Sequence, residues 1–246
     1  MILKINKENK FKIIIVAGPT ASGKSSLALD LAKKYNGIII NADSQQIYKE
    51  LPILSSQPSK KNYVKIPHKL FNFLDFYKIF SVDHWFKLVK KEITKAEKKN
   101  LLPIIVGGTG MYINTLLNGL RVYPRVSESL RKKGRKIIER IGSKKFYEKL
   151  KEKNKTCVYK ISPNDKIRLL RSWEIYEISK KSIYEINKEN KLKKLDSYDL
   201  FKVLIFPPRK QVYLNCTQRW KKMIKSGAIE EVKMLVKKEK KLKKKI

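Results

Sequence analysis

Short apolar runs separated by longer amphipathic segments dominate the first 120 residues of the chain. The runs predict three buried strands, at residues 11–17, 38–42 and 101–106. The spacing of apolar positions between and after them predicts helices at residues 25–35, 82–99 and 111–118. Strands that alternate with helices are typical of a parallel sheet, because parallel neighbours need a long crossover connection. We therefore predict an α/β fold, with helices that flank a parallel sheet.

The segment that follows the second strand carries no such pattern. It holds three prolines and a short apolar stretch, at Pro52, Pro58, Pro67 and residues 70–74. Proline fixes φ and removes a backbone donor, which favours turns over regular structure. We expect an irregular connection here, before Ser81 caps the helix at 82–99.

The pattern changes after residue 120, where strand-like runs give way to charged segments with helical periodicity. These predict helices near residues 127–141, 143–153, 165–179 and 182–187. An apolar run stopped by two prolines then predicts a further strand, at residues 200–206. The final helices are predicted at residues 211–225 and 228–238, and the lysine-rich residues 237–246 are expected to be frayed.

The chain is thus expected to have three parts. They are an α/β core at residues 1–120, an all-helical insertion at 121–195, and a return to the core at 196–246.

Residues 18–25 match the phosphate-binding pattern G-x-x-x-x-G-K-[ST]. The motif comprises Gly18, Pro19, Thr20, Ala21, Ser22, Gly23, Lys24 and Ser25. It follows a predicted strand and opens a predicted helix, where free N–H groups and the helix dipole attract anions. Lys24 supplies a positive charge, and the Ser25 hydroxyl can ligate Mg²⁺. The motif predicts a di- or triphosphate ligand and a sheet like that of P-loop NTPases.

The net charge of the chain is +36, from 58 basic and 22 acidic residues. A charge of this size indicates a polyanionic partner such as nucleic acid. Lysine makes up 49 of the basic residues, and an AT-rich genome also produces a lysine-rich composition. The nine arginines are more informative, because a planar guanidinium suits phosphates and bases. All lie between Arg121 and Arg219, which makes the second half the part expected to face a polynucleotide.

Other features of the composition narrow the class of protein. No apolar run is long enough to cross a membrane, and residues 1–10 lack the apolar segment of a secretory signal. Cys157 and Cys216 lie far apart without a CxxC partner, as expected in a reducing compartment. His68 and His84 have no metal-ligand spacing, and we interpret them as structural or surface residues. A cytoplasmic protein without membrane association is predicted.

Two polar residues follow predicted strands, in addition to the phosphate loop. Asp43 comes after the second strand, and Thr109 follows the third within Gly-Gly-Thr-Gly. Because parallel sheets bind ligands at the carboxyl ends of their strands, the three features are expected to converge. An aspartate beside a phosphate can hold Mg²⁺ or act as a base, and a threonine can steady a phosphate or a nucleophile. Each residue could instead serve only a turn or a cap, but together they favour an active site.

Several stretches of the sequence, taken together, resemble the tRNA dimethylallyltransferases. The phosphate loop is shared with kinases and GTPases, whereas its combination with Asp-Ser-x-x-x-Tyr and Gly-Gly-Thr-x-x-Tyr is specific. The stretches are residues 18–25, 43–48, 67–68, 106–112 and 164–165 with Arg168 and Arg171. Their order and spacing agree with the family over residues 11–235.

The resemblance implies transfer of a dimethylallyl group from dimethylallyl diphosphate to the N6 amine of a tRNA adenosine. This adenosine, number 37, lies just 3′ of the anticodon in tRNAs that read UNN codons. The phosphate loop would hold the leaving diphosphate, whose charge Lys24 and Mg²⁺ at Ser25 would offset. Asp43 would take the N6 proton as general base, and Thr109 would position the amine or the diphosphate.

The resemblance also implies contacts to the anticodon stem-loop of tRNA from both halves of the chain. The implied residues are Asp43, Ser44, Gln45, Gln46, Thr109, Arg131, Ile167, Arg168, Leu169, Leu170 and Arg171. Arg168 and Arg171 are three positions apart, which places them on one face of the predicted helix. Because relatives extend further, the resemblance implies a shortened carboxyl end. We expect a monomer that retains diphosphate binding better than transfer.

Three other functions stay open at this point. A small-molecule kinase of the P-loop type would carry an arginine-rich lid, which the helical insertion could imitate. An enzyme that prenylates free AMP or ADP would have no need of a basic insertion. A degenerate, non-catalytic RNA-binding relative is disfavoured by four residues that are all intact, Lys24, Ser25, Asp43 and Thr109.

Overall fold

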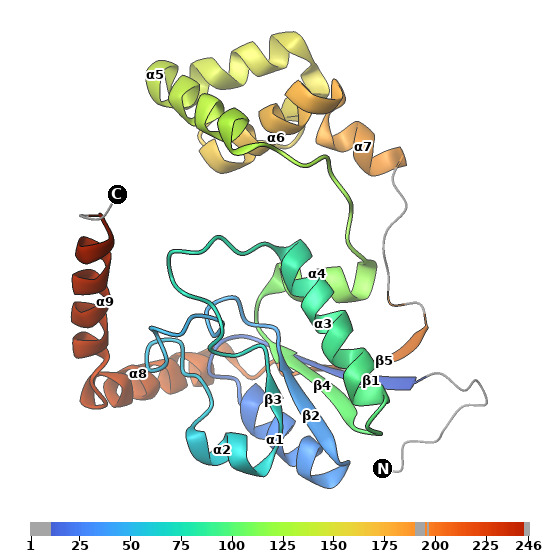
Figure 1. Ribbon diagram of the computed structural model, residues 1–246, viewed down its shortest axis with the longest axis vertical. Helices are drawn as coiled ribbons and strands as arrows, with labels where there is room; N and C mark the ends of the chain where they lie inside the picture. Colours follow the sequence, from blue (N-terminus) through green and yellow to red (C-terminus); the bar gives the residue numbers. More distant parts are fainter. Residues whose placement is uncertain (1–10, 190–194, 196, 244–246) are drawn as a thin grey trace. The chain divides into compact units, whose positions relative to one another are not determined.

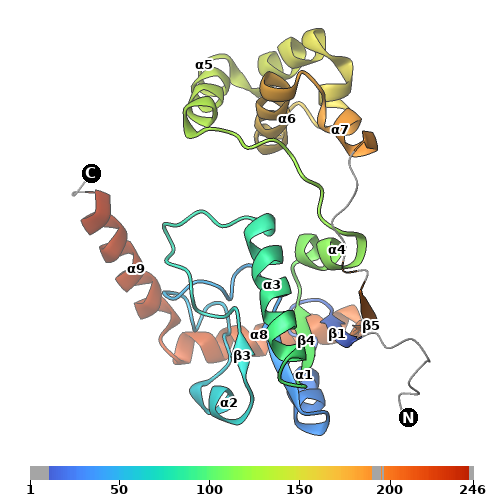
Figure 2. The same ribbon diagram turned by 45° about the vertical axis from the view of Figure 1, so that its right-hand side comes forward.

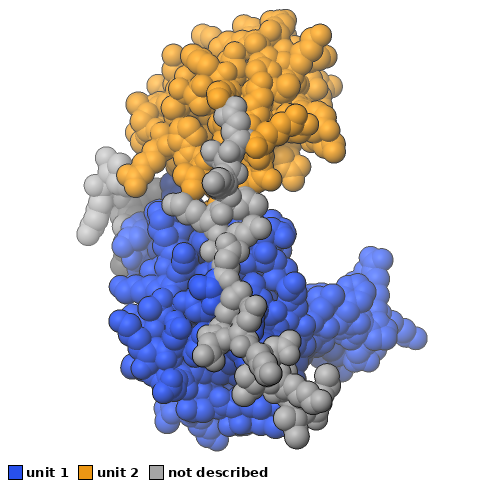
Figure 3. Space-filling model, turned by 90° about the vertical axis from the view of Figure 1, so that its right-hand side faces the viewer, with its two compact units in different colours: residues 1–119, 194–246 blue, residues 120–193 orange. Residues whose placement is uncertain are grey.

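The computed structural model, drawn in two orientations in Figure 1 and Figure 2, describes residues 11–189, 195 and 197–243. The chain forms two compact units, which Figure 3 colours separately. Unit 1 comprises Met1–Gly119 and Lys194–Ile246, and unit 2 comprises Leu120–Lys193. Within the described ranges, no helix is long and apolar enough to cross a membrane.

Unit 1 is built on a five-stranded sheet whose neighbouring strands all pair in parallel (Figure 1). The strands are β1 (Phe11–Ala17), β2 (Gly37–Asn41), β3 (His68–Lys69), β4 (Leu102–Gly107) and β5 (Tyr198–Leu204). Across the sheet their order is β3-β2-β4-β1-β5. The centre of β1, Ile13–Val16, is buried throughout, as expected where helices cover both faces of a parallel sheet. The α/β fold predicted from the sequence is confirmed.

The two edge strands differ from the prediction. β3 lies in the segment expected to be irregular, and it pairs with β2 at two positions, starting from His68. β5 begins at Tyr198 rather than at residue 200, because it pairs with the whole of β1 from Phe11 onward. The apolar run continues past the strand to Phe206, which is 81% exposed. Hydrophobicity therefore located this strand, but pairing with β1 sets its bounds.

The helices of unit 1 connect and follow these strands. They are α1 (Lys24–Lys34), α2 (Lys60–Lys65), α3 (Val82–Glu97), α4 (Gly110–Asn118), α8 (Arg209–Lys225) and α9 (Ala228–Lys243). The predicted cap of α3 is confirmed, since Ser81 Oγ accepts a hydrogen bond from the His84 N–H at 3.3 Å. The short α2 was not predicted. α9 extends to Lys243, beyond its predicted end at residue 238; lysine is a good helix former, and Lys238 pairs with Glu50. The expected fraying stays a prediction, and residues 244–246 lie outside the described part of the chain.

Helix α1 packs against one face of the sheet and so holds the strands in place. Ala28 and Ala32 of α1 lie in one buried cluster with Ile14 and Val16 of β1. Side chains alternate along a strand, so Ile13 faces the other side, where it is also fully buried. With both faces covered, the carboxyl ends of the strands are the edge at which polar groups can gather.

Unit 2 is helical, as predicted, and has an apolar core of its own. Its elements are α5 (Glu128–Lys153), η1 (Lys155–Val158), α6 (Lys166–Ser179) and α7 (Ile183–Glu189). α5 is interrupted at Gly142, whose φ of 79° and ψ of 160° are not helical, so it consists of two helical stretches, as predicted from the sequence. The core includes Phe146 and Leu150 of α5 and Trp173 of α6.

Gly134 lies where α5 approaches α6 so closely that a Cβ atom would stand 2.8 Å from Cζ3 of Trp173. We expect Gly134→Ala to lower the free energy of unfolding by about 1–3 kcal/mol, because the ring must move within a packed core. Helix propensity alone would make the alanine variant more stable by roughly 1 kcal/mol. A loss of stability therefore indicates that the contact with Trp173 outweighs helix propensity. Chemical denaturation measures it, with Lys133→Ala at an exposed neighbouring position as control. A variant more stable than the parent would contradict the close packing.

Candidate functional site

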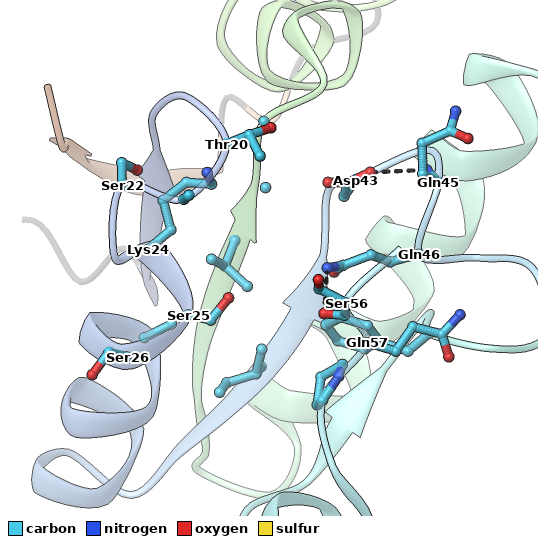
Figure 4. A pocket seen from close by; sticks show the side chains of 18 of the residues that line it. Thr20, Ser22, Lys24, Ser25, Ser26, Asp43, Gln45, Gln46, Ser56 and Gln57 are labelled. Atoms are coloured by element: carbon cyan, nitrogen blue, oxygen red, sulfur yellow. Dashed lines mark hydrogen bonds between the residues drawn. The ribbon is translucent and has the colours of Figure 1, made fainter. Parts of the chain in front are cut away.

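A cavity of about 540 Å³ lies in unit 1 where β1, β2 and β4 end. Two walls of different composition border it (Figure 4). The phosphate-loop wall consists of residues 20–26 together with Arg219 of α8. The Asp43 wall consists of residues 43–46 and 56–59, and Thr109 after β4 also lines the cavity. The structure thus brings together the phosphate loop, Asp43 and Thr109, which the strand-end argument expected to converge.

The backbone of the phosphate loop adopts conformations that require glycine. A Cβ atom at Gly18 would lie 2.3 Å from the carbonyl oxygen of Ile205, and Gly23 has a φ of 91°. α1 begins at Lys24 with no side-chain cap and no acidic residue in its first turn. The N–H groups of this turn and the helix dipole are therefore available to an anion in the cavity.

Lys24 is the cation of this loop, and its Nζ donates a hydrogen bond to the Pro19 carbonyl at 2.5 Å. Burial lowers the pKa of Lys24, while nearby Asp43 raises it and Arg219 lowers it. Two like charges on one wall favour an anion that binds to both. Ser22 Oγ, in the same loop, is a buried polar atom with no hydrogen-bond partner in the described chain, which also fits a polar ligand.

Asp43 is positioned by Asn41, a residue that is completely buried. Asn41 Oδ1 accepts a hydrogen bond from the Asp43 N–H at 2.8 Å, and Nδ2 donates to the carbonyls of Asp43 at 2.9 Å and Leu70 at 3.0 Å. The Asn41 carbonyl accepts from Trp85 Nε1 at 2.9 Å, and Trp85 stacks on Tyr112 with ring centroids 4.1 Å apart. These contacts fix the backbone from which the Asp43 carboxylate projects.

The Asp43 carboxylate stands across the cavity from Lys24 and Ser25 (Figure 4). Its Oδ1 accepts a hydrogen bond from the Gln45 N–H at 2.8 Å, and its Oδ2 makes none with the residues that the structure describes. Burial, with Tyr48 and Asp43 adding to the effect, raises the pKa of Tyr112 to about 12. That hydroxyl therefore stays protonated at neutral pH, whereas the Asp43 carboxylate presents an oxygen, Oδ2, that has no partner among the described residues.

Thr109 ties the loop after β2 to the end of β4. Its Oγ1 accepts a hydrogen bond from the Ser44 N–H at 2.8 Å and donates to Ser44 Oγ at 3.3 Å. The two strands approach so closely that a Cβ atom at Gly107 would lie 2.1 Å from the Ala42 carbonyl oxygen. The Thr109 hydroxyl thus fixes the loop that carries Asp43.

Gln46 also has a clear structural partner. Its Nε2 donates to the carbonyls of Ser55 at 2.9 Å and Ser56 at 3.0 Å. The amide nitrogen of Gln46 therefore holds the second segment of the Asp43 wall. The contact to tRNA predicted for this residue stays a prediction.

Some residues of the site were not found from the sequence. Arg219 reaches the cavity from α8, whose Asn215 Nδ2 donates to the Ala21 carbonyl at 3.0 Å. No local signal marks this arginine. His68, interpreted as structural or surface, also lines the cavity, and its Nδ1 lies 2.8 Å from the Ile66 carbonyl oxygen. Asn41 could have been recognised as a polar residue that ends a fully apolar strand.

Within the described residues, no group of three or more His, Cys, Asp and Glu side chains could hold a metal ion. Mg²⁺ needs no such group, because it commonly binds substrate phosphates and only one or two protein oxygens. Ser25 on one wall and Asp43 on the other offer oxygen donors of the kind it prefers. The residues present therefore fit a Mg²⁺ ion that enters with a diphosphate.

The remaining predicted contacts lie in unit 2. Ile167 is 82% exposed, whereas Leu169 is completely buried, so its side chain is not available to RNA in this conformation. Arg168 Nη1 lies 3.3 Å from Asp165 Oδ2, and Arg171 Nη1 lies 3.4 Å from Glu174 Oε2. Arg131 of α5 is half-buried, and Leu170 packs against the core of the unit.

The family model described as IPP transferase matches residues 46–246 of this chain. The chain belongs to the IPP transferase family. The resemblance stated from its motifs is confirmed.

Curated members of the family include a tRNA dimethylallyltransferase of Rickettsia canadensis, which is 40% identical over 93% of this chain and 70% of its own length. Among solved structures, a eukaryotic dimethylallyltransferase acting on tRNA has a TM-score of 0.76 and 29% identity, over 92% of this chain and 56% of that one. The tRNA isopentenylpyrophosphate transferase of Bacillus halodurans has a TM-score of 0.62 and 27% identity, over 93% and 71%. This IPP transferase chain spans 64% to 74% of the length of the curated relatives compared.

Replacement of Asn41 tests the support of Asp43. We expect Asn41→Ala to lower the free energy of unfolding by about 2–4 kcal/mol, because it removes a fully buried side chain and its three hydrogen bonds to partly buried backbone groups of Asp43 and Leu70. Chemical denaturation measures the change. The control is Asn118→Ala, which removes an exposed hydrogen bond to Asn114 and should cost less than about 0.5 kcal/mol. Equal losses for the two variants would refute the assigned role.

Proposed function

We propose that this chain transfers a dimethylallyl group from dimethylallyl diphosphate to N6 of adenosine 37 in tRNAs that read UNN codons. The observation that carries the proposal is the contrast between the two walls of one cavity. Lys24 and Arg219 on one side suit a diphosphate, and the Asp43 carboxylate on the other suits an amine that must lose a proton. The names of the relatives support the same reaction.

In the proposed reaction, N6 attacks the first carbon of the dimethylallyl group. A C–N bond forms while the C–O bond to the diphosphate breaks, and the electron pair of that bond leaves with the diphosphate. Lys24, Arg219 and the N–H groups at the start of α1 stabilise the charge that develops there. Mg²⁺ held at Ser25 together with the diphosphate would supply further neutralisation of that charge.

The acceptor needs a base because the lone pair of N6 is delocalised into the adenine ring. Asp43 takes the N6 proton through the Oδ2 atom that the loop leaves unoccupied, while Oδ1 stays on the Gln45 N–H. Thr109 acts through its hydrogen bond to Ser44, which holds this loop. The adenosine must leave its stack to reach the cavity, and this costs less in an anticodon loop, whose bases are already unpaired.

Recognition of the tRNA is proposed for both units. Ser44, Gln45 and Gln46 belong to the wall that would receive the adenosine. In unit 2, the proposed contacts are Arg131, Ile167, Arg168, Leu170 and Arg171, with Leu169 as the core residue that anchors their helix. A substrate of this kind implies action in the cytoplasm, and the predicted monomer stays a prediction.

Asp43→Asn tests the reaction directly. With Mg²⁺, radiolabelled dimethylallyl diphosphate and a transcribed tRNA, we expect transfer of label to fall by at least about 100-fold, because the general base is lost. Binding of inorganic pyrophosphate, measured by calorimetry, should change little, since the phosphate-loop wall is intact.

The matched control is the same transcript with guanosine at position 37, which offers no N6 amine. Transfer by Asp43→Asn at a rate near that of the parent would remove Asp43 as the base. Phosphoryl transfer from ATP by the parent, without prenyl transfer, would replace the proposal by the kinase alternative.

Arg168→Ala combined with Arg171→Ala tests the RNA contacts of unit 2. If both arginines contact phosphates, the slope of log affinity for tRNA against log salt should become shallower by roughly 1.5. Filter binding at several salt concentrations measures the slope. Arg135→Ala is the control, because Arg135 is exposed on α5 and paired with Glu128. An unchanged slope would assign Arg168 and Arg171 to their ion pairs within unit 2 alone.

A further inference from the structure

Glu231 of α9 is a buried carboxylate that the proposed reaction does not use. It is 4% exposed, although it lies on a helix whose next residue toward the N-terminus, Glu230, is exposed. Its Oε1 accepts a hydrogen bond from the Ile53 N–H at 2.8 Å, and its Oε2 accepts one from the Leu54 N–H at 2.9 Å. A carboxylate so deeply buried needs these two donors to offset the loss of its hydration.

The two donors belong to a compact turn in residues 51–57. Within it, the Ser55 N–H donates to the Leu51 carbonyl at 3.1 Å, and the Gln57 N–H donates to the Pro52 carbonyl at 3.0 Å. Successive turns of this kind leave their first N–H groups without a local acceptor. Glu231 therefore caps the turn from a helix distant in sequence.

The other end of the turn leads directly into the cavity. Its last carbonyls, those of Ser55 and Ser56, accept the two hydrogen bonds from Gln46 Nε2. Ser56, Gln57 and Gln46 all line the cavity, and Figure 4 shows them on the same side as Asp43. The turn is thus held between Glu231 outside the cavity and Gln46 inside it.

A second contact joins α9 to the start of the same segment. Lys238 Nζ lies 2.5 Å from Glu50 Oε1, and Glu50 Oε2 accepts a hydrogen bond from the Phe76 N–H at 3.1 Å. The Lys238 side chain is 47% exposed, so this ion pair contributes less than the buried capping bonds. α9 therefore holds the segment mainly through Glu231.

We propose that Glu231 is a positioning residue that sets the geometry of the Asp43 wall from outside the cavity. The inference rests on the proposed function in one respect, namely that the acceptor adenosine binds at the Asp43 wall. The phosphate-loop wall is supported separately, by β1, α1 and Asn215 of α8. Loss of the Glu231 carboxylate should therefore weaken acceptor binding and leave diphosphate binding unchanged.

Glu231→Gln tests this, with Glu230→Gln as the matched control on the same helix. Glutamine keeps one acceptor oxygen but presents an N–H₂ donor to a backbone donor, so one capping bond is lost. In steady-state transfer assays, we expect the KM for tRNA to rise about tenfold in Glu231→Gln. The affinity for inorganic pyrophosphate should stay within about twofold of the parent, a difference too small to indicate a lost hydrogen bond. Glu230→Gln should match the parent in both measurements.

Amide hydrogen exchange supplies a readout that does not depend on the reaction. Exchange in the peptide that spans residues 51–57 should accelerate in Glu231→Gln and not in Glu230→Gln. Glu231→Asp replaces Glu231→Gln if that variant does not fold. Aspartate keeps the charge on a shorter side chain, and we expect it too to raise the KM for tRNA while leaving the affinity for pyrophosphate unchanged.

The inference is overturned if the KM for tRNA and the exchange in residues 51–57 are the same in Glu231→Gln and Glu230→Gln. It is also overturned if the affinity for pyrophosphate falls by the same factor as the KM for tRNA rises, since that outcome indicates a general loss of folding. A parent chain that transfers no label would defeat the proposed function instead. The exchange measurement would still decide whether Glu231 holds the turn.

Discussion

The hydrogen bonds of one buried side chain, Asn41, determine where the carboxylate side of the site can lie. The Asn41 amide binds the backbone of Asp43 on both its N–H and carbonyl sides, and it also holds the Leu70 carbonyl. Its own carbonyl is held by the Trp85 indole. Because a buried amide must satisfy all its donors and acceptors, it permits few arrangements of the chain around it. The position of Asp43 is therefore fixed by the core of the sheet rather than by the surface loop in which it lies.

The two C-terminal helices of the described chain support the opposite walls of the cavity. α8 contacts the phosphate loop through Asn215 and brings Arg219 to the lining. α9 caps the turn behind the Asp43 wall through Glu231. Gly227, with a φ of 94°, allows the sharp change of direction between the two helices. The shape of a site whose predicted residues lie mostly near the N-terminus therefore depends on two helices about 200 positions later in the sequence.

These contacts also explain how far the sequence could predict the site. The phosphate loop is encoded by local spacing, and Asp43 and Thr109 were found because the strand ends of a parallel sheet must meet. Arg219 and Glu231 could not be found in this way, since their roles depend on contacts between distant segments and they stand among many other charged residues. For the same reason the sequence located β5 by its apolar residues but not its first residue, which its pairing with β1 determines. Leu169 shows the opposite case. The family resemblance implied that it contacts tRNA, but its side chain is buried in the core of unit 2, where it supports the neighbouring residues of its helix.

The charges of the cavity are arranged in an order that suits group transfer. Burial lowers the pKa of Lys24 and nearby Arg219 lowers it further, whereas Asp43 across the cavity raises it. A diphosphate bound between the two cations would act in the same direction as Asp43 and favour the charged ammonium. In the proposed reaction, departure of the diphosphate would move negative charge toward Lys24 and Arg219, and removal of the N6 proton would neutralise the Asp43 carboxylate. Lys24 and Arg219 already line the side of the cavity where the charge of the departing diphosphate would develop, so little reorganisation of the phosphate-loop wall would be needed. Asn41 on one side and the contact of α8 with the phosphate loop on the other hold the two walls that carry these opposite charges.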